Sequence, residues 1–228
     1  YTTIDDPSAF FQTTLYTGNG SNDLSITNGG NSDLQPDFVW LKQRDSRDHF
    51  LFDSVRGIRK YVASNTTAAD DTLSDGLKSF DSDGFTIDDG VGINENNDPH
   101  VSWNWKTGTA LNNSAGANGG SIATTGSINT TSGFGIVKYE GSGANATIYH
   151  GLGKIPRLII TKNIDQTFHW SVYTFNSNTK ILRLNGTNAE ATESAFQSTH
   201  PTATVQSLGN HNQNNGATDG SADTHISY

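Results

Sequence analysis

The chain has 228 residues, of which 32% are hydrophobic and 10% aromatic, enough apolar surface for one large domain or two small ones. Its 23 acidic residues outnumber its 14 basic ones, and the net charge of −9 argues against DNA or an anionic membrane surface as a partner. The absence of cysteine excludes a disulfide framework and a thiolate metal site, and no apolar stretch is long enough to span a membrane.

The first half of the chain reads as a series of short strands. Each segment has roughly 5–7 residues, is rich in Val, Ile, Thr, Tyr, Phe and Trp, and is bounded by turn residues such as NGG and SDG. In the last segment, Val101, Trp103 and Trp105 alternate with polar residues, the pattern of a half-buried strand. The predicted strands lie at 13–18, 37–42, 49–55, 60–64, 84–87 and 100–106.

The second half repeats this pattern after a connection. Residues 109–133 are rich in Gly, Ser, Asn and Thr and predict a flexible or extended connection, whose second half can join the next domain as a strand through Ile122 and Ile128. Further strands are predicted at 134–139, 157–162, 169–175, 180–185, 204–209 and 224–228. A turn or two of helix after an asparagine cap is predicted within 65–77 and within 185–196.

The two halves also share residues at a fixed spacing, which predicts an internal duplication. PDFVWLK at 36–42 becomes PRLIITK at 156–162, an offset of 120 residues. YTGNG at 16–20 matches YEGSG at 139–143, and HVSW at 100–103 matches HISY at 225–228, at slightly larger offsets. The pairs at the offset of 120 are Pro36 and Pro156, Lys42 and Lys162, His49 and His169, Lys60 and Lys180, Asn65 and Asn185, Thr67 and Thr187, and Ala69 and Ala189.

We therefore predict an all-β protein made of two tandem, internally duplicated small β-sandwich domains with jelly-roll-like wiring. The first domain spans 1–108, the connection 109–133, and the second domain 134–228, which we expect to be truncated at its C-terminal end. The six repeated residues Pro36, Pro156, Lys42, Lys162, His49 and His169 are interpreted as scaffold positions, because a catalytic device seldom needs duplicating.

The sequence offers no recognisable catalytic motif. It lacks the zinc-binding HExxH pattern, the GxSxG nucleophile turn, the phosphate-binding GxxxxGK loop and a dinucleotide fingerprint. The few glutamates stand scattered in turn-rich stretches, which is unlike the facing carboxylates of a glycosidase. We therefore predict that the chain is not an enzyme and needs no cofactor.

Three binding hypotheses remain open. The acidic loop DSDGFTIDDG suggests calcium through Asp81, Asp83, Asp88 and Asp89, although Asp and Gly also favour simple turns. Aromatic residues suggest stacking on sugar rings, with Phe50, His169 and Trp170 as the candidates and core packing as the alternative. The basic segment from Lys42 to Lys60 suggests contact with an acidic loop such as Asp81–Asp89 of a neighbouring copy, or a solvated sheet edge.

Several motifs together resemble those of structural proteins from tailed phages of marine bacteria, cyanophages in particular. The opening YTTIDDPSAFFQTTLYTGNG resembles their N-terminal start, and the motifs of a β-rich domain repeated in them follow along nearly the whole chain. The motifs are LQPDFVWLKQRD, LFDSVRG, SFDSDGFTI and VSWNWK in the first half, and HGLGKIPRLIITKN, KILRLN and DTHISY in the second, where YTFNSNTK lacks the DSVRG of the first copy.

The resemblance implies a non-catalytic virion protein: a tail fibre, an appendage or a capsid-surface decoration that contributes to host attachment. It implies localisation in the virion after synthesis in the host bacterial cytoplasm, with other virion proteins as partners. We also expect a homo-oligomer, because the polar surface suits contact between copies, and the aromatic residues leave a host-surface glycan open as a further partner. No site residue is transferred by it. The alternatives are a carbohydrate-binding module and, further away, a polysaccharide-degrading enzyme.

Overall fold

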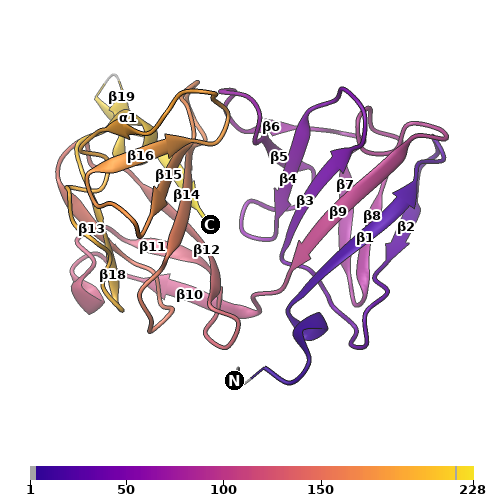
Figure 1. The fold of residues 1–228 in the computed structure, drawn as a ribbon, viewed down its shortest axis with the longest axis horizontal. Coiled ribbons are helices and arrows are strands. Elements are labelled where there is room, and N and C mark those ends of the chain that lie inside the picture. Colours follow the sequence, from indigo (N-terminus) through magenta and orange to yellow (C-terminus); the bar gives the residue numbers. More distant parts are fainter. Residues whose placement is uncertain (1–3, 219) are drawn as a thin grey trace. The chain divides into compact units, whose positions relative to one another are not determined.

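The computed structural model describes residues 4–218 and 220–228, and the fold is all-β, as predicted (Figure 1). Among these residues the helical elements are the 3-10 turns η1 (Pro7–Ala9) and η2 (Ala117–Gly119) and the four-residue helix α1 (Asn212–Asn215). None of these is long and apolar enough to cross a membrane. The described residues form two compact units: unit 1 comprises 4–64 and 70–108, and unit 2 comprises the rest.

Unit 1 contains a six-stranded and a three-stranded antiparallel sheet. The order is β1-β9-β3-β4-β5-β6 in the large sheet and β2-β8-β7 in the small one, so β3 to β6 form a meander. The strands are β1 (Phe11–Thr17), β2 (Leu24–Thr27), β3 (Phe38–Gln43), β4 (His49–Asp53), β5 (Lys60–Ala63), β6 (Asp71–Thr72), β7 (Leu77–Asp81), β8 (Gly84–Ile87) and β9 (Pro99–Trp105).

The core of unit 1 lies between its two sheets. Alternate residues of β3 and β4 point to one side, because successive side chains of a strand face opposite ways. From the large sheet these are Val39, Leu41 and Phe52, and they cluster with residues of the small sheet such as Phe85 and Ile87. All five are fully buried. The two sheets therefore pack face to face as a sandwich.

Unit 2 contains an eight-stranded sheet in the order β10-β11-β12-β21-β14-β15-β16-β17, a two-stranded sheet β13-β18, and a small hairpin β19-β20. The strands are β10 (Thr109–Asn113), β11 (Thr124–Asn129), β12 (Phe134–Glu140), β13 (Ala146–Tyr149), β14 (Leu158–Asn163), β15 (Ser171–Thr174), β16 (Lys180–Arg183), β17 (Ala191–Thr192), β18 (Val205–Leu208), β19 (Ala217–Thr218), β20 (Ser221–Ala222) and β21 (Thr224–Ser227).

Two apolar clusters fill unit 2. One joins the large sheet to β13 and β18 and includes Val137, Ile148 and Leu208. The other lies beside β14, β15 and β16 and includes Tyr173 and Phe196. The second unit therefore also has its own hydrophobic core.

The large sheets of the two units share one strand order. The order β1-β9-β3-β4-β5-β6 corresponds place by place to β12-β21-β14-β15-β16-β17, and the pairing is antiparallel throughout. The smaller sheets correspond through β2-β8 and β13-β18. A duplicated domain is the simplest account of this match, and we keep the duplication as a prediction that the topology supports.

Registers and strand starts agree with the offset of 120 residues. Lys60 lies opposite Thr72, and Lys180 lies opposite Thr192. Pro36 and Pro156 each stand two residues before the strand that holds the third place in the shared order, β3 and β14. The fixed spacing read from the sequence therefore corresponds to equivalent positions in space within each unit.

Two local expectations were wrong. The first half of the segment 109–133 is not a flexible connection, because it contains strand β10, which pairs with β11. The second half joins the second unit as a strand, as predicted: β11 contains Ile128 and pairs with β12. The helical turns expected within 65–77 and 185–196 are also not found; both segments contain turns and a two-residue edge strand, β6 or β17. Neither segment offers the broad apolar stripe that stabilises a short helix by packing.

Candidate functional site, an open groove and a repeated polar network

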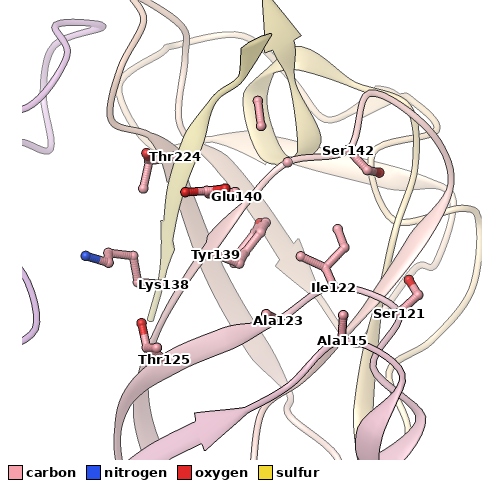
Figure 2. A pocket seen from close by; sticks show the side chains of 12 residues that line it. Ala115, Ser121, Ile122, Ala123, Thr125, Lys138, Tyr139, Glu140, Ser142 and Thr224 are labelled. Carbon is pink, nitrogen blue, oxygen red and sulfur yellow. The ribbon is translucent and has the colours of Figure 1, made fainter.

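An open groove of about 570 Å³ lies in unit 2 where strands β11 and β12 separate (Figure 2). Their ladder ends at the pair Thr124–Tyr139. Before Thr124 the chain turns towards β13, where Ile122 bridges Ile148 and the N–H of Ile122 donates to the carbonyl of Thr147. Strand β12 continues along β21 instead. The groove therefore exists because two paired strands leave each other for different sheets.

The groove offers hydroxyl groups, one ammonium group and one carboxylate to a ligand. Lys138, Thr125 and Thr224 stand on one side of it, and Ile122 and Ser121 stand on the other (Figure 2). Of the twelve lining residues, Glu140 alone carries a carboxylate. Glycoside hydrolysis ordinarily uses two facing carboxylates, so this lining suits hydrogen bonding to a polar molecule better than bond cleavage.

A network of polar side chains occurs in both units. In unit 2 it includes Tyr139, which also lines the groove. In unit 1, the rings of Tyr16 and His100 stack at 4.9 Å with an interplanar angle of 9°. The hydroxyl of Tyr16 donates to the carbonyl of Ile93 at 2.6 Å, and Nδ1 of His100 lies 2.9 Å from the carbonyl of Asp98. Both rings therefore hold backbone of the segment that leads into β9.

Unit 2 repeats these contacts atom for atom. Tyr139 stacks on His225 at 5.3 Å and 11°, and its hydroxyl donates to the carbonyl of Asn214 at 2.6 Å. Nδ1 of His225 lies 2.9 Å from the carbonyl of Asp223. Because Nε2 accepts the N–H of Gly216, the neutral ring carries its proton on Nδ1 and donates it to Asp223.

A buried asparagine completes the network in unit 1. The side-chain oxygen of Asn94 accepts the N–H of Asn19 at 2.8 Å. Its amide nitrogen donates to the carbonyls of Ser21 at 2.8 Å and Asp88 at 3.1 Å. The Asn94 side chain is fully buried and ties the loop 19–21 and the backbone at Asp88 to its own segment.

Asn215 makes the same contacts in unit 2. It accepts the N–H of Ser142 at 2.8 Å and donates to the carbonyls of Ala144 at 2.5 Å and Gly209 at 3.1 Å. It is fully buried too. The sequence reasoning missed both asparagines, because they stand 121 residues apart, an offset that none of the matched motifs has, and only an alignment with gaps pairs them.

The second glycine of each motif has a defined backbone role. Gly20 and Gly143 have φ angles of 62° and 64°, in the left-handed region that favours glycine. Their N–H groups donate to the backbone carbonyls of Asn94 and Asn215, at 2.9 and 3.1 Å. The motif Tyr-x-Gly-x-Gly is therefore the loop that the buried asparagine holds.

The burial of His225 predicts how the stability of the protein depends on pH. Burial lowers its pKa to about 4, outweighing the nearby Asp223 and Asp165, which favour the charged ring. In the unfolded chain the pKa is about 6.5, so between these values the unfolded state binds more protons and stability falls as the pH falls. The contribution of neutral His225 is complete above pH 6.5, and at most about 3 kcal/mol is lost on acidification towards pH 4.

The variant His225→Asn tests this, because its side-chain N–H can still reach the carbonyl of Asp223. We expect it to be less stable than the parent at pH 7 and to lose less stability between pH 6.5 and 4, measured by denaturant unfolding at each pH. An unchanged pH slope in the variant would show that His225 does not govern this window.

The aromatic residues predicted to bind sugar are mostly core residues. Phe50 is 7% exposed and Trp170 is fully buried, so neither offers a ring face to a ligand. His169 is half-buried, with Nδ1 at 3.0 Å from the side-chain amide of Asn185. The stacking site predicted from these three residues is therefore wrong, because the rings of Phe50 and Trp170 are buried.

The four aspartates predicted to bind calcium are not brought together. Asp81 accepts hydroxyl hydrogen bonds from Ser79 and Thr86, both at 2.7 Å. Asp88 pairs with Arg59 at 2.8 Å, at the other end of strand β8. Asp83 lies before the start of strand β8 and Asp89 lies after its end. In the part of the chain that the structure describes, no group of three metal-binding side chains occurs. The calcium hypothesis is therefore wrong for this loop.

The basic segment from Lys42 to Lys60 is largely paired within its own unit. Arg59 pairs with Asp88, a member of the acidic loop that was expected to come from a neighbouring copy. Arg56 and Lys60 both pair with Asp70. The contact between basic segment and acidic loop thus forms inside unit 1, which removes the reason to expect it between copies.

The repeated lysines do have a shared scaffold role. Nζ of Lys42 donates to the carbonyls of Asp45 and Arg47, at 2.5 and 3.1 Å. Nζ of Lys162, which is fully buried, donates to the carbonyls of Asn163 at 2.6 Å and Gln166 at 3.2 Å. Each ammonium therefore closes the loop that follows its strand, and burial lowers the pKa of Lys162 to about 8.

Comparison with known proteins gives one match. Residues 6–228, nearly the whole chain, match the model of a family described as a domain of unknown function (DUF7483). No curated protein and no solved structure matches the chain.

Proposed function

We propose that this chain, which belongs to the DUF7483 family, is a non-catalytic structural protein of a tailed-phage particle: a tail fibre, an appendage or a capsid-surface decoration. The sequence motifs that resemble marine phage structural proteins support the phage particle. The structural role is supported by one observation, the use of the same buried polar residues in both units to hold backbone.

A catalytic site needs reactive groups that face a ligand. Here the repeated tyrosines, histidines and asparagines contact backbone atoms, as Tyr16 does at Ile93 and Asn94 does at Asp88. The repeated lysines do the same at loop carbonyls. The side chains that could act in catalysis therefore hold backbone within each unit. Such self-contained units suit a particle protein built from repeated domains, in which each domain contacts its neighbours.

Localisation tests this proposal. Antibodies raised against the purified chain are expected to label intact particles isolated from an infected culture, and the chain is expected to co-purify with them through a density gradient. Antibodies depleted on the pure chain are the control. Finding the chain only in the soluble lysate, with particles unlabelled, would overturn the proposal.

Sugar binding in the groove of unit 2 is the second candidate, because the groove presents hydroxyl groups beside Lys138 and Glu140. Under the structural proposal alone, a glycan array gives no signal above background. Reproducible binding that Lys138→Ala and Glu140→Ala abolish, while Lys154→Ala on an exposed loop does not, would establish a host-attachment role. Binding unaffected by the two groove variants would exclude the groove.

A further inference from the structure

Strand β1 stands at one edge of the large sheet of unit 1. Its neighbour is β9, and within residues 4–218 and 220–228 no strand pairs with its other side. It is seven residues long and contains no proline or charged residue. An edge of this kind is a template for pairing with another strand, and proteins ordinarily blunt it with charge, proline or a cover.

The backbone groups that point outwards can be assigned. At one end the N–H of Lys106 donates to Phe10, and at the other Gly18 donates to Asp98. Ladder bonds of an antiparallel pair alternate, so the even-numbered residues between them direct their backbone to β9. The N–H and C=O groups of the odd-numbered residues point away from the sheet: Phe11, Thr13, Leu15 and Thr17.

The same edge is covered in unit 2. Strand β12 has the place of β1 in the shared order, and the hairpin strand β11 pairs along its outer side. Ile136 lies opposite Ser127, and Lys138 lies opposite Thr125. One unit of this chain thus shows how an antiparallel strand is added at this edge, while the other unit presents the edge open.

The side chains at the open edge suit an uncharged apolar partner. Leu15 is 66% exposed and Phe11 is 40% exposed, although both lie in a strand. No charged residue occurs from residue 7 to residue 22, in a chain of net charge −9. Two copies therefore meet here without the like-charge repulsion that much of their surface imposes.

We propose that β1 pairs antiparallel with β1 of a second copy, joining two large sheets edge to edge. A two-fold axis at Thr14 sets Thr13 opposite Leu15 of the other copy and Phe11 opposite Thr17. These are the residues whose backbone groups point outwards, so each such pair forms two ladder bonds. Phe11 and Leu15 of the other copy become diagonal neighbours on one face, within reach of an aromatic ring. This pairing does not depend on the proposed function.

The first test is Leu15→Lys, which sets two added ammonium groups at the centre of the pairing. Sedimentation velocity over a concentration series is expected to show a monomer–dimer equilibrium for the parent chain and a dissociation constant at least about tenfold larger for the variant. Val91→Lys, at an exposed apolar residue of the same unit, makes the same charge change away from the edge and should behave as the parent does.

The second test uses the absence of cysteine from the chain. In the proposed register the two Thr14 Cα atoms lie about 4.5 Å apart, within disulfide range. Thr14→Cys is expected to form a covalent dimer under mild oxidation, and Val91→Cys is not. A parent chain that stays monomeric at every concentration, a dimer that Leu15→Lys leaves intact, or a Thr14→Cys variant that fails to cross-link would each overturn the proposal.

Discussion

Replacing Arg56 with alanine is expected to lower the free energy of unfolding by about 3–5 kcal/mol. The Arg56 side chain is 2% exposed and pairs with Asp53 and Asp70, each at 2.6 Å. It also donates to the carbonyl of Leu51 at 2.8 Å. Asp53 is itself fully buried, so removing the guanidinium leaves a buried carboxylate without its counter-charge. A buried charge that loses its partner is much more costly than an exposed one.

Lys60→Ala is the matched control, because Lys60 pairs with the same Asp70 at 3.4 Å but is 44% exposed. We expect Lys60→Ala to lower the free energy of unfolding by less than about 1 kcal/mol, because exposed ion pairs contribute little. Denaturant unfolding followed by tryptophan fluorescence measures both losses, since three of the four tryptophans, Trp40, Trp103 and Trp105, lie in unit 1. Equal losses in the two variants would show that burial of the Arg56 cluster does not determine its energy.

Alanine at Asn94 or at Asn215 is expected to lower the free energy of unfolding by about 3 kcal/mol in either unit, because each change removes three side-chain hydrogen bonds to the backbone, worth about 1 kcal/mol each. The equality of the two effects is the sharper expectation, since the contacts correspond one by one. Asn96→Ala, at an exposed asparagine two residues from Asn94, should be nearly neutral. Denaturant unfolding of the three variants measures these differences.

A large loss at one asparagine beside a small loss at the other would contradict the idea that the two networks are equivalent. Asn94→Asp and Asn215→Asp distinguish the acceptor role of the side-chain oxygen from the donor role of the side-chain nitrogen. Each keeps an acceptor for the loop N–H but replaces the amide donor with oxygen, which faces two carbonyls. Both aspartate variants should therefore remain clearly destabilised.

Strand positions were the part of the fold that the sequence predicted best. The apolar runs gave β3, β4, β5 and β9, because these strands carry bulky residues between strong turn signals. Strand β2 and its counterpart β13 were missed, since LSIT and ATIY are four residues long and lie among Ser, Asn and Gly. Their strand state comes from pairing with β8 and β18, which are distant in sequence. Local composition does not report such pairing.

Site prediction failed where it depended on the direction of a side chain. Trp170 immediately precedes a strand, and sequence alone does not say which side of the sheet it faces. The four acidic residues failed for a geometric reason, because strand β8 separates Asp81 from Asp88 by about 13 Å at about 3.3 Å per residue. The groove could not be predicted from the sequence, because it forms where Ile122 pairs with Ile148, and local sequence does not indicate that pairing.

The shorter hydrogen bonds from the buried asparagines to the loops go to main-chain atoms: the N–H of Asn19 and the carbonyl of Ser21 in one unit, and those of Ser142 and Ala144 in the other. Longer contacts to the side chains of Asn19 and Ser142, at 3.2 and 3.4 Å, add to them. The four main-chain contacts persist whichever side chains those loop positions carry. Outside the two glycines, the loops can therefore diversify in sequence while their course stays fixed. This end of each sandwich is a frame on which new surfaces can evolve, or be engineered, without rebuilding the fold beneath.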